Sequence, residues 1–212
     1  LGGLRLGFRV GLGCGVELTG FGFRFGFGKP QLPEFGRGPR CLPDLGCGRR
    51  HLCVGCAAGA CPGGIVSGGR LLDGHHGNAG HFGHIVVEPD GRPCVCGGKG
   101  CVEAYCSGRA IEEETGRPPQ RAPQGVVERT GILIGRALTS LGAICDLNMA
   151  VIGGSVALGF GEPFFVALQT ELEQRAKLSF LKGFTVVPAG LGQLAPLVGA
   201  AALVRRRLAS SR

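Results

Sequence analysis

One histidine and three cysteines lie close together in the middle of the chain, within the segment 84–103. These candidate ligands are His84, Cys94, Cys96 and Cys101, and the cysteines have the spacing C-x-C-x4-C. Glycines between the cysteines let the backbone turn sharply enough for three thiolates to converge on one ion. One imidazole and three thiolates complete a tetrahedral shell with no open position. The pattern therefore predicts a zinc ion with a structural role, not a catalytic one.

Other interpretations of these residues are weaker. A disulfide or ordinary buried thiols would account for the cysteines, but clustered Cys/His spacing is a metal signature and disulfides are rare in cytosolic chains. His75 and His76 are rival nitrogen ligands, and we prefer His84 because the rivals stand in a polar, glycine-rich turn. His84 opens an apolar run, 84–87, which predicts a strand. Cys106 is predicted to be a small buried hydrophobe.

The same region carries a longer pattern that resembles the signature of the ROK family of sugar kinases and repressors, particularly the bacterial glucokinases. The segments that carry it are G-N-A-G-H-F-G-H at 77–84, P-D-G at 89–91, C-V-C-G-G-K-G-C-V-E at 94–103, D-L-N-M-A-V-I-G-G-S at 146–155 and V-P-A-G at 187–190. The resemblance covers about residues 63–210. It implies an α/β fold class, the C-terminal lobe of the actin-like (ribonuclease-H-like) sugar kinase fold with a zinc-binding loop at 84–103.

The resemblance also implies roles for single residues. Glu103 matches a glutamate that accepts hydrogen bonds from sugar hydroxyls, and His84 faces the sugar as well as the metal. Where the family usually has another glutamate, this chain has His81, which lacks paired carboxylate acceptors. The sugar preference, and sugar binding itself, therefore stay open. Gly153 and Gly154 match the segment that lies against the nucleotide, where backbone amides can hold phosphate, although their spacing alone would indicate only a tight turn.

The implied activity is ATP-dependent phosphorylation of a hexose, with glucose as the expected substrate and ATP and Mg²⁺ as cofactors of the complete enzyme. Such a kinase also needs a D-x-G-G-T-type loop for the phosphates and an Asn-Asp pair whose aspartate takes the proton from the sugar hydroxyl. We find neither motif, since the one aspartate before residue 63 is Asp44, with no asparagine beside it. The chain is therefore predicted to be inactive alone. A repressor fragment that binds sugar and a purely structural zinc module are the alternatives.

Residues 1–62 differ in composition from residues 63–212. They hold 16 of the 42 glycines, 6 of the 11 cysteines and 8 basic against 3 acidic residues, so most of the net charge of +8 comes from them. Their glycine-rich runs have neither helical periodicity nor a core pattern. A disordered arm, a nucleic-acid-binding or condensate-forming tail, and translation out of frame would each explain this. We favour the last, because the chain begins at Leu1 and the family-like sequence starts abruptly at Gly63.

Beyond residue 62 the patterns predict a mixture of strands and helices. The predicted strands are 64–66, 70–72, 84–87, 149–152 and 184–187, and the predicted helices are 109–114, 126–145, 163–178 and 196–208. No signal peptide or membrane span is evident. We therefore expect a cytoplasmic protein with a hexose substrate and no membrane or nucleic-acid partner. The resemblance implies a homo-oligomer, because the family often dimerises through this lobe and the apolar helices would otherwise be partly exposed.

Overall fold

The computed structural model describes residues 9–11, 16–19, 50–55, 59–194, 197–199, 201 and 204. They fall into two units, one formed by residues 47–193 and the other by residues 1–46 together with 194–212. In the second unit, β1 (Arg9–Gly11) pairs antiparallel with β2 (Val16–Thr19). The unit 47–193 contains every predicted site residue.

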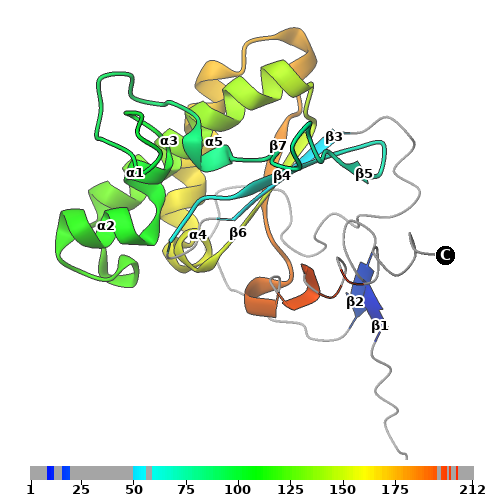
Figure 1. The fold of residues 1–212 in the computed structure, drawn as a ribbon, viewed down its shortest axis with the longest axis horizontal. Coiled ribbons are helices and arrows are strands. Elements are labelled where there is room, and N and C mark those ends of the chain that lie inside the picture. The colour runs from blue at the N-terminus through cyan, green and yellow to red at the C-terminus, as the bar shows by residue number, and fades with distance from the viewer. Residues whose placement is uncertain are drawn as a thin grey trace, which may run out of the picture. The chain divides into compact units, whose positions relative to one another are not determined.

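A five-stranded mixed sheet forms the centre of the unit 47–193 (Figure 1). In spatial order the strands are β5 (Arg70–Leu71), β4 (Gly63–Ser67), β3 (Arg50–Gly55), β6 (Met149–Gly153) and β7 (Thr185–Pro188). Strands β3, β6 and β7 are parallel, whereas β4 runs antiparallel to β3 and β5. The carboxyl ends of the three parallel strands consequently meet at one edge of the sheet. The strands predicted at 64–66, 70–72, 149–152 and 184–187 are confirmed.

Strand β3 corrects the predicted boundary at residue 62. The sequence pattern places residues 50–55 in the segment without a core pattern, yet Leu52 and Val54 are buried in the middle of the sheet. They face Ala150 and Ile152 of β6 in register, and all four side chains belong to one hydrophobic core. Their period-2 alternation is that of an ordinary strand, but the surrounding glycines and cysteines concealed it. The folded lobe begins by residue 50, and the prediction for residues 1–49 lies, apart from β1 and β2, outside the described residues.

Two long helices, α3 (Gln124–Cys145) and α5 (Glu162–Arg175), pack against each other and share this core. They approach closely because Gly131 and Gly135, one turn apart on α3, face α5. A Cβ atom at Gly131 would lie 2.5 Å from the carbonyl oxygen of Phe164, and one at Gly135 would lie 3.0 Å from that of Leu168. Any larger residue would therefore push the two helices apart.

The shorter helices complete the lobe. They are α1 (Glu103–Cys106), α2 (Gly108–Thr115) and α4 (Ser155–Phe160), with 3-10 turns η1 (Phe82–His84), η2 (Pro119–Arg121), η3 (Ser179–Leu181) and η4 (Gly192–Leu194). The helices predicted at 109–114 and 126–145 are confirmed, and the one predicted at 163–178 ends at Arg175. Most of the helix predicted at 196–208 lies outside the described residues. Among the described residues, no helix has both the length and the apolar character needed to cross a bilayer.

The prediction of a strand at 84–87 is wrong. His84 ends the turn η1, and the residues after it form a single antiparallel bridge, Val86 with Cys101. A continuous ladder does not form because the opposite chain turns sharply at Gly100, where φ is +71°. The residues that suggested a strand therefore hydrogen-bond to the backbone of residues 100–102, at the end of the predicted metal-binding segment 93–101 (the metal loop), and are not part of the main sheet.

Candidate metal centre and substrate site

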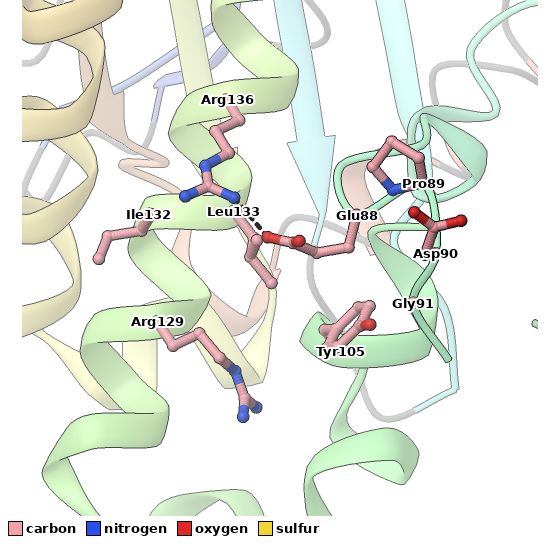
Figure 2. A pocket seen from close by; sticks show the side chains of 9 residues that line it. All are labelled: Glu88, Pro89, Asp90, Gly91, Tyr105, Arg129, Ile132, Leu133 and Arg136. Atoms are coloured by element: carbon pink, nitrogen blue, oxygen red, sulfur yellow. Dashed lines mark hydrogen bonds and ion pairs between the residues drawn. The ribbon is translucent and has the colours of Figure 1, made fainter. Parts of the chain in front are cut away.

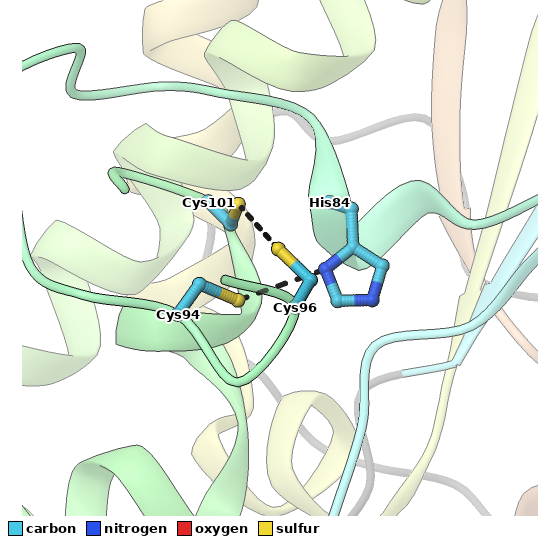
Figure 3. A group of neighbouring side chains, drawn as sticks. All are labelled: His84, Cys94, Cys96 and Cys101. Atoms are coloured by element: carbon cyan, nitrogen blue, oxygen red, sulfur yellow. Dashed lines mark hydrogen bonds between the residues drawn. The ribbon is translucent and has the colours of Figure 1, made fainter. Parts of the chain in front are cut away.

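The structure brings the four predicted metal ligands together (Figure 3). Their ligand atoms all lie within 4.8 Å of one another. The Cys96 and Cys101 sulfurs are 3.8 Å apart, and the Cys94 sulfur lies 3.7 Å from Nδ1 of His84. A tetrahedron with zinc–sulfur bonds of about 2.3 Å has sulfur–sulfur edges of about 3.8 Å, whereas a disulfide bond is about 2.05 Å long. The donor set and its spacing thus fit a tetrahedral ion and not a disulfide.

Tight backbone turns position the three cysteines. The Cys94 N–H donates to the carbonyl of Gly98 at 2.9 Å, and the Gly97 N–H donates back to the carbonyl of Cys94 at 3.0 Å. Gly100 has a positive φ and passes so close to Glu88 that a Cβ there would lie 1.6 Å from its carbonyl oxygen. Glycine alone can occupy this position, which explains why the cysteine loop needs it.

The thiols of the cluster differ in their surroundings. Burial, and after it the neighbouring thiols of Cys94 and Cys96, together raise the pKa of Cys101 to about 12. Cys96 is exposed, and a hydrogen bond with the backbone of Gly98 lowers its pKa. Several adjacent thiolates repel one another, and a bound cation supplies the positive charge that keeps coordinating thiols deprotonated. The cluster is therefore chemically suited to a metal ion.

The predicted sugar-binding residues lie beside this cluster. Glu103 is the first residue of α1, and its Oε2 accepts a hydrogen bond from the Cys61 N–H at 3.2 Å. The same oxygen lies over Gly83, where a Cβ would approach it to 2.8 Å. The rings of His81 and His84 are stacked, with centroids 5.7 Å apart and planes 18° from parallel. The structure therefore groups Glu103, His81 and His84 around the turn η1.

The predicted phosphate turn lies at the carboxyl edge of the sheet. Gly153 ends β6 in register with Gly55 at the end of β3, and Gly154 precedes α4 with φ of +90°. A Cβ at Gly153 would lie 3.3 Å from the side chain of Ala189, the residue after β7, so the backbone at Gly153 passes close to the end of that strand. The chain that leaves β3 at this edge continues to Cys61, the residue that holds Glu103. The glycine turn and the predicted sugar-binding residues therefore belong to one edge of the sheet.

A pocket of about 540 Å³ opens between the metal loop and helices α1 and α2. Its polar lining includes Arg92, Glu103, Ser107 and Arg109, and Cys94 borders it. Hydrogen-bonding side chains of this kind suit a polar, hydroxylated ligand better than an apolar one.

A comparison with models of known protein families identifies the family of this chain. The model of the ROK family matches residues 49–207. The chain belongs to the ROK family. The match includes β3 and begins before residue 63, which agrees with the corrected boundary. Cys106, completely buried in this ROK lobe, is the small core residue that the sequence predicted.

Relatives of this ROK chain include sugar kinases. The N-acetylmannosamine kinase of Escherichia fergusonii is 37% identical over 128 residues, which cover 53% of this chain and 43% of the relative. The N-acetylmannosamine kinase of Escherichia coli O157:H7 is 39% identical over 127 residues with the same coverage. The chain thus spans less than half the length of these curated relatives.

Solved ROK structures have the same fold. The ROK hexokinase from Thermus thermophilus has 32% identity and a TM-score of 0.63, covering 73% of this chain and 58% of that one. A ROK family glucokinase from Streptomyces griseus, solved with glucose and AMPPNP, has 27% identity and a TM-score of 0.65, covering 79% of this chain and 64% of that one. A ROK family transcriptional regulator is similar in fold alone, at 22% identity and a TM-score of 0.62. The predicted resemblance and the mixed α/β, actin-like fold are confirmed.

Sequence reasoning missed the residues that hold the metal loop on the ROK lobe. Tyr105, the single tyrosine of the chain, is buried, and its hydroxyl accepts a hydrogen bond from the Arg92 N–H at 2.8 Å. Arg136 on α3 pairs with Glu88 across 48 positions of sequence. The rarity of tyrosine was a usable signal, but nothing local indicated the ion pair.

Proposed function

We propose that this ROK chain is the sugar-binding lobe of an ATP-dependent sugar kinase. The observation that carries the proposal is the position of Glu103. Its carboxylate is held by the Cys61 N–H beside the His81–His84 pair, at the edge of the sheet where the parallel strands end. Crevices outside the carboxyl ends of parallel strands are the usual ligand sites of α/β sheets. A fixed carboxylate there can accept hydrogen bonds from two sugar hydroxyls.

We propose N-acetylmannosamine as the first candidate substrate, with the glucose expected from sequence as the second. Two relatives at 37% and 39% identity carry the former name. The chemistry of His81 supports the same choice. A neutral imidazole can donate a hydrogen bond to an acetamido carbonyl oxygen, whereas a carboxylate can only accept. A glutamate at position 81 would favour plain hydroxyls.

We also propose that His84, Cys94, Cys96 and Cys101 hold one Zn²⁺ ion. Four protein ligands leave no open position, so the ion would fix the loop and take no part in the reaction. Its contribution to the sugar site is then indirect, because it anchors the ring of His84 next to His81.

For the nucleotide we propose that backbone amides around Gly153 and Gly154 contact the phosphates of ATP, which Mg²⁺ accompanies in the complete enzyme. Phosphoryl transfer depends on positioning and charge stabilisation, and the sequence offers neither a phosphate loop nor an Asn-Asp pair. The isolated chain is therefore expected to bind sugar without transferring phosphate. A longer version that represses transcription and shows no ATP turnover would favour the second candidate, a repressor fragment.

Isothermal titration calorimetry tests the proposal. N-acetylmannosamine and glucose are titrated separately into the zinc-loaded chain, its Glu103→Ala variant and a Glu112→Ala control. Glu112 is exposed on α2 and makes the same change of charge away from the site. We expect binding by the wild type and the control, loss of binding in Glu103→Ala, and equal zinc content in all three. Equal affinity of Glu103→Ala and wild type, or no binding of either sugar by the zinc-loaded wild type, would overturn the proposal.

A further inference from the structure

We infer that two ion-pair clamps fix the turn 88–92 to the helices and thereby position the metal loop. Glu88 and Arg92 are the positioning residues, and Arg136 and Glu114 are their main partners. The inference rests on the proposed metal centre. It adds to that centre a set of residues, none of them a ligand, on which its stability depends.

The first clamp joins the turn to the two long helices. Arg136 on α3 donates through Nη1 to Oε1 of Glu88 and through Nε to Oε1 of Glu171, the latter at 3.0 Å. Glu171 on α5 has a side chain only 9% exposed and accepts a second hydrogen bond from Arg175. Arg136 therefore pairs with the buried carboxylate of Glu171 as well as with Glu88. Figure 2 shows the contact with Glu88. A guanidinium fixed in this way loses little further freedom when it pairs.

The second clamp joins the turn to α2 and α3. Glu114 accepts from Arg92 at 3.0 Å and from both terminal nitrogens of Arg129 at 2.6 Å. The two guanidinium carbons lie 4.8 Å and 5.8 Å from the centroid of the Tyr105 ring. The tyrosine hydroxyl meanwhile accepts the Arg92 N–H at 2.8 Å. One side of the turn is thus fixed by charge, stacking and a backbone hydrogen bond together.

The clamped turn is also the backbone frame of the metal loop. The Glu88 N–H donates to the carbonyl of Gly100 at 3.2 Å, and the Gly100 N–H donates to the carbonyl of Arg92 at 2.8 Å. Gly100 directly precedes the ligand Cys101. The loop beyond the turn buries little of its own surface, since Val95 is 77% exposed and Cys96 is exposed as well. The fixed point of the loop is therefore the turn 88–92.

The pocket between this turn and α3 supports a positioning role over a binding role. It has a volume of about 540 Å³, and Glu88, Tyr105, Arg129 and Arg136 are among its lining residues. Both arginines are already paired with carboxylates of the protein. An incoming anion would have to break these ion pairs. We therefore assign both arginines to holding the turn 88–92 and not to binding a ligand.

The experiment measures the rate at which the zinc-loaded full chain loses zinc to the chromophoric chelator 4-(2-pyridylazo)resorcinol at pH 7 and low salt. The variants are Glu88→Gln, Arg136→Met, the double variant and Arg136→Lys. Asp90→Asn is the matched control, because Asp90 lies in the same turn, the substitution makes the same change of charge, and Asp90 takes part in none of the ion pairs among the described residues. Mutation of residues that support metal ligands without binding the metal typically lowers metal affinity by about 10- to 100-fold.

We expect Glu88→Gln and Arg136→Met each to release zinc about 10-fold faster than the control. The double variant should be no faster than Arg136→Met, because both single changes break the same contact. Arg136→Lys keeps the positive charge, so it should release zinc more slowly than Arg136→Met but faster than wild type. A salt concentration of 1 M should reduce the difference in release rate between wild type and Glu88→Gln. Release by the single variants at the control rate, or additive effects in the double variant, would overturn the clamp. A wild type that retains no zinc would overturn the metal centre together with the clamp, whereas absent sugar binding would leave this test unaffected.

Discussion

Glu114 offers a sharp test of how much the ion pairs stabilise this lobe. Its hydrogen bonds with Arg129 and then Arg92 lower the pKa of the carboxyl from 4.5 to about 2. Taken at face value, this difference corresponds to about 3 kcal/mol of folding stability at neutral pH. The arginine side chains are 31% and 39% exposed, so solvent screening reduces the expected contribution to about 1–2 kcal/mol.

The sign of the pH dependence follows from the direction of the pKa shift. A carboxyl whose pKa is lower in the folded state stabilises the fold fully above about pH 4.5, the ordinary pKa, and this stability is lost as the pH falls from 4.5 towards 2. The Glu114→Gln variant lacks this contribution at every pH. The difference in unfolding free energy between wild type and variant should therefore be about 1–2 kcal/mol at pH 7 and shrink steadily below pH 4.5.

Urea denaturation followed by circular dichroism at pH 7, 4.5 and 3 measures this difference. Metal-ligating thiols and imidazoles also protonate in acid, so the quantity to compare is wild type minus variant and not either stability alone. Glu112→Gln, an exposed neighbour on the same helix, controls for the change of charge. A difference that stays constant from pH 7 to pH 3, or one no larger than in the control, would refute the assignment of the clamp to a charged Glu114.

Two further predictions concern the core and the cluster. Phe164→Ala should lower the unfolding free energy by about 3–5 kcal/mol, because its side chain on α5 is completely buried in the hydrophobic core. Phe180→Ala is the control because Phe180 is half exposed, and equal losses in urea denaturation would argue against this packing. Cys101→Ser should reduce the zinc content measured by plasma mass spectrometry to near zero. Cys145→Ser is the control, because Cys145 lies outside the cluster, and it should leave the content at one ion per chain. Full zinc occupancy in Cys101→Ser would remove this residue from the ligand set.

Local patterns in the sequence predicted the cluster and most helices correctly. The cysteines, with the histidine ten residues before the first, stand within one loop, so residue type and glycine turns suffice to bring them together. The helix α3 follows from its apolar periodicity. In both cases the residues that meet are near each other in the chain.

Sequence patterns failed where distant segments determine the structure. Strand β3 is stabilised by its neighbours β4 and β6, and β6 lies almost one hundred residues away in the sequence. The apolar alternation of β3 is short and stands among glycines, so the local sequence alone did not predict a strand. The strand predicted at 84–87 failed because Gly100 on the opposite chain ends the ladder after one bridge. The Glu88–Arg136–Glu171 chain of ion pairs spans three separate elements, and no spacing rule connects them.

We propose that His84, Cys94, Cys96 and Cys101 form a closed zinc centre beside the proposed sugar site. X-ray absorption at the zinc K edge measures the ligand shell of this centre. We predict a first shell of one nitrogen at about 2.0–2.1 Å and three sulfurs at about 2.3 Å, with no exchangeable oxygen. A shell with fewer sulfurs and one or more oxygen ligands would contradict the closed centre, as would a purified chain without zinc in which Cys96 and Cys101 form a disulfide.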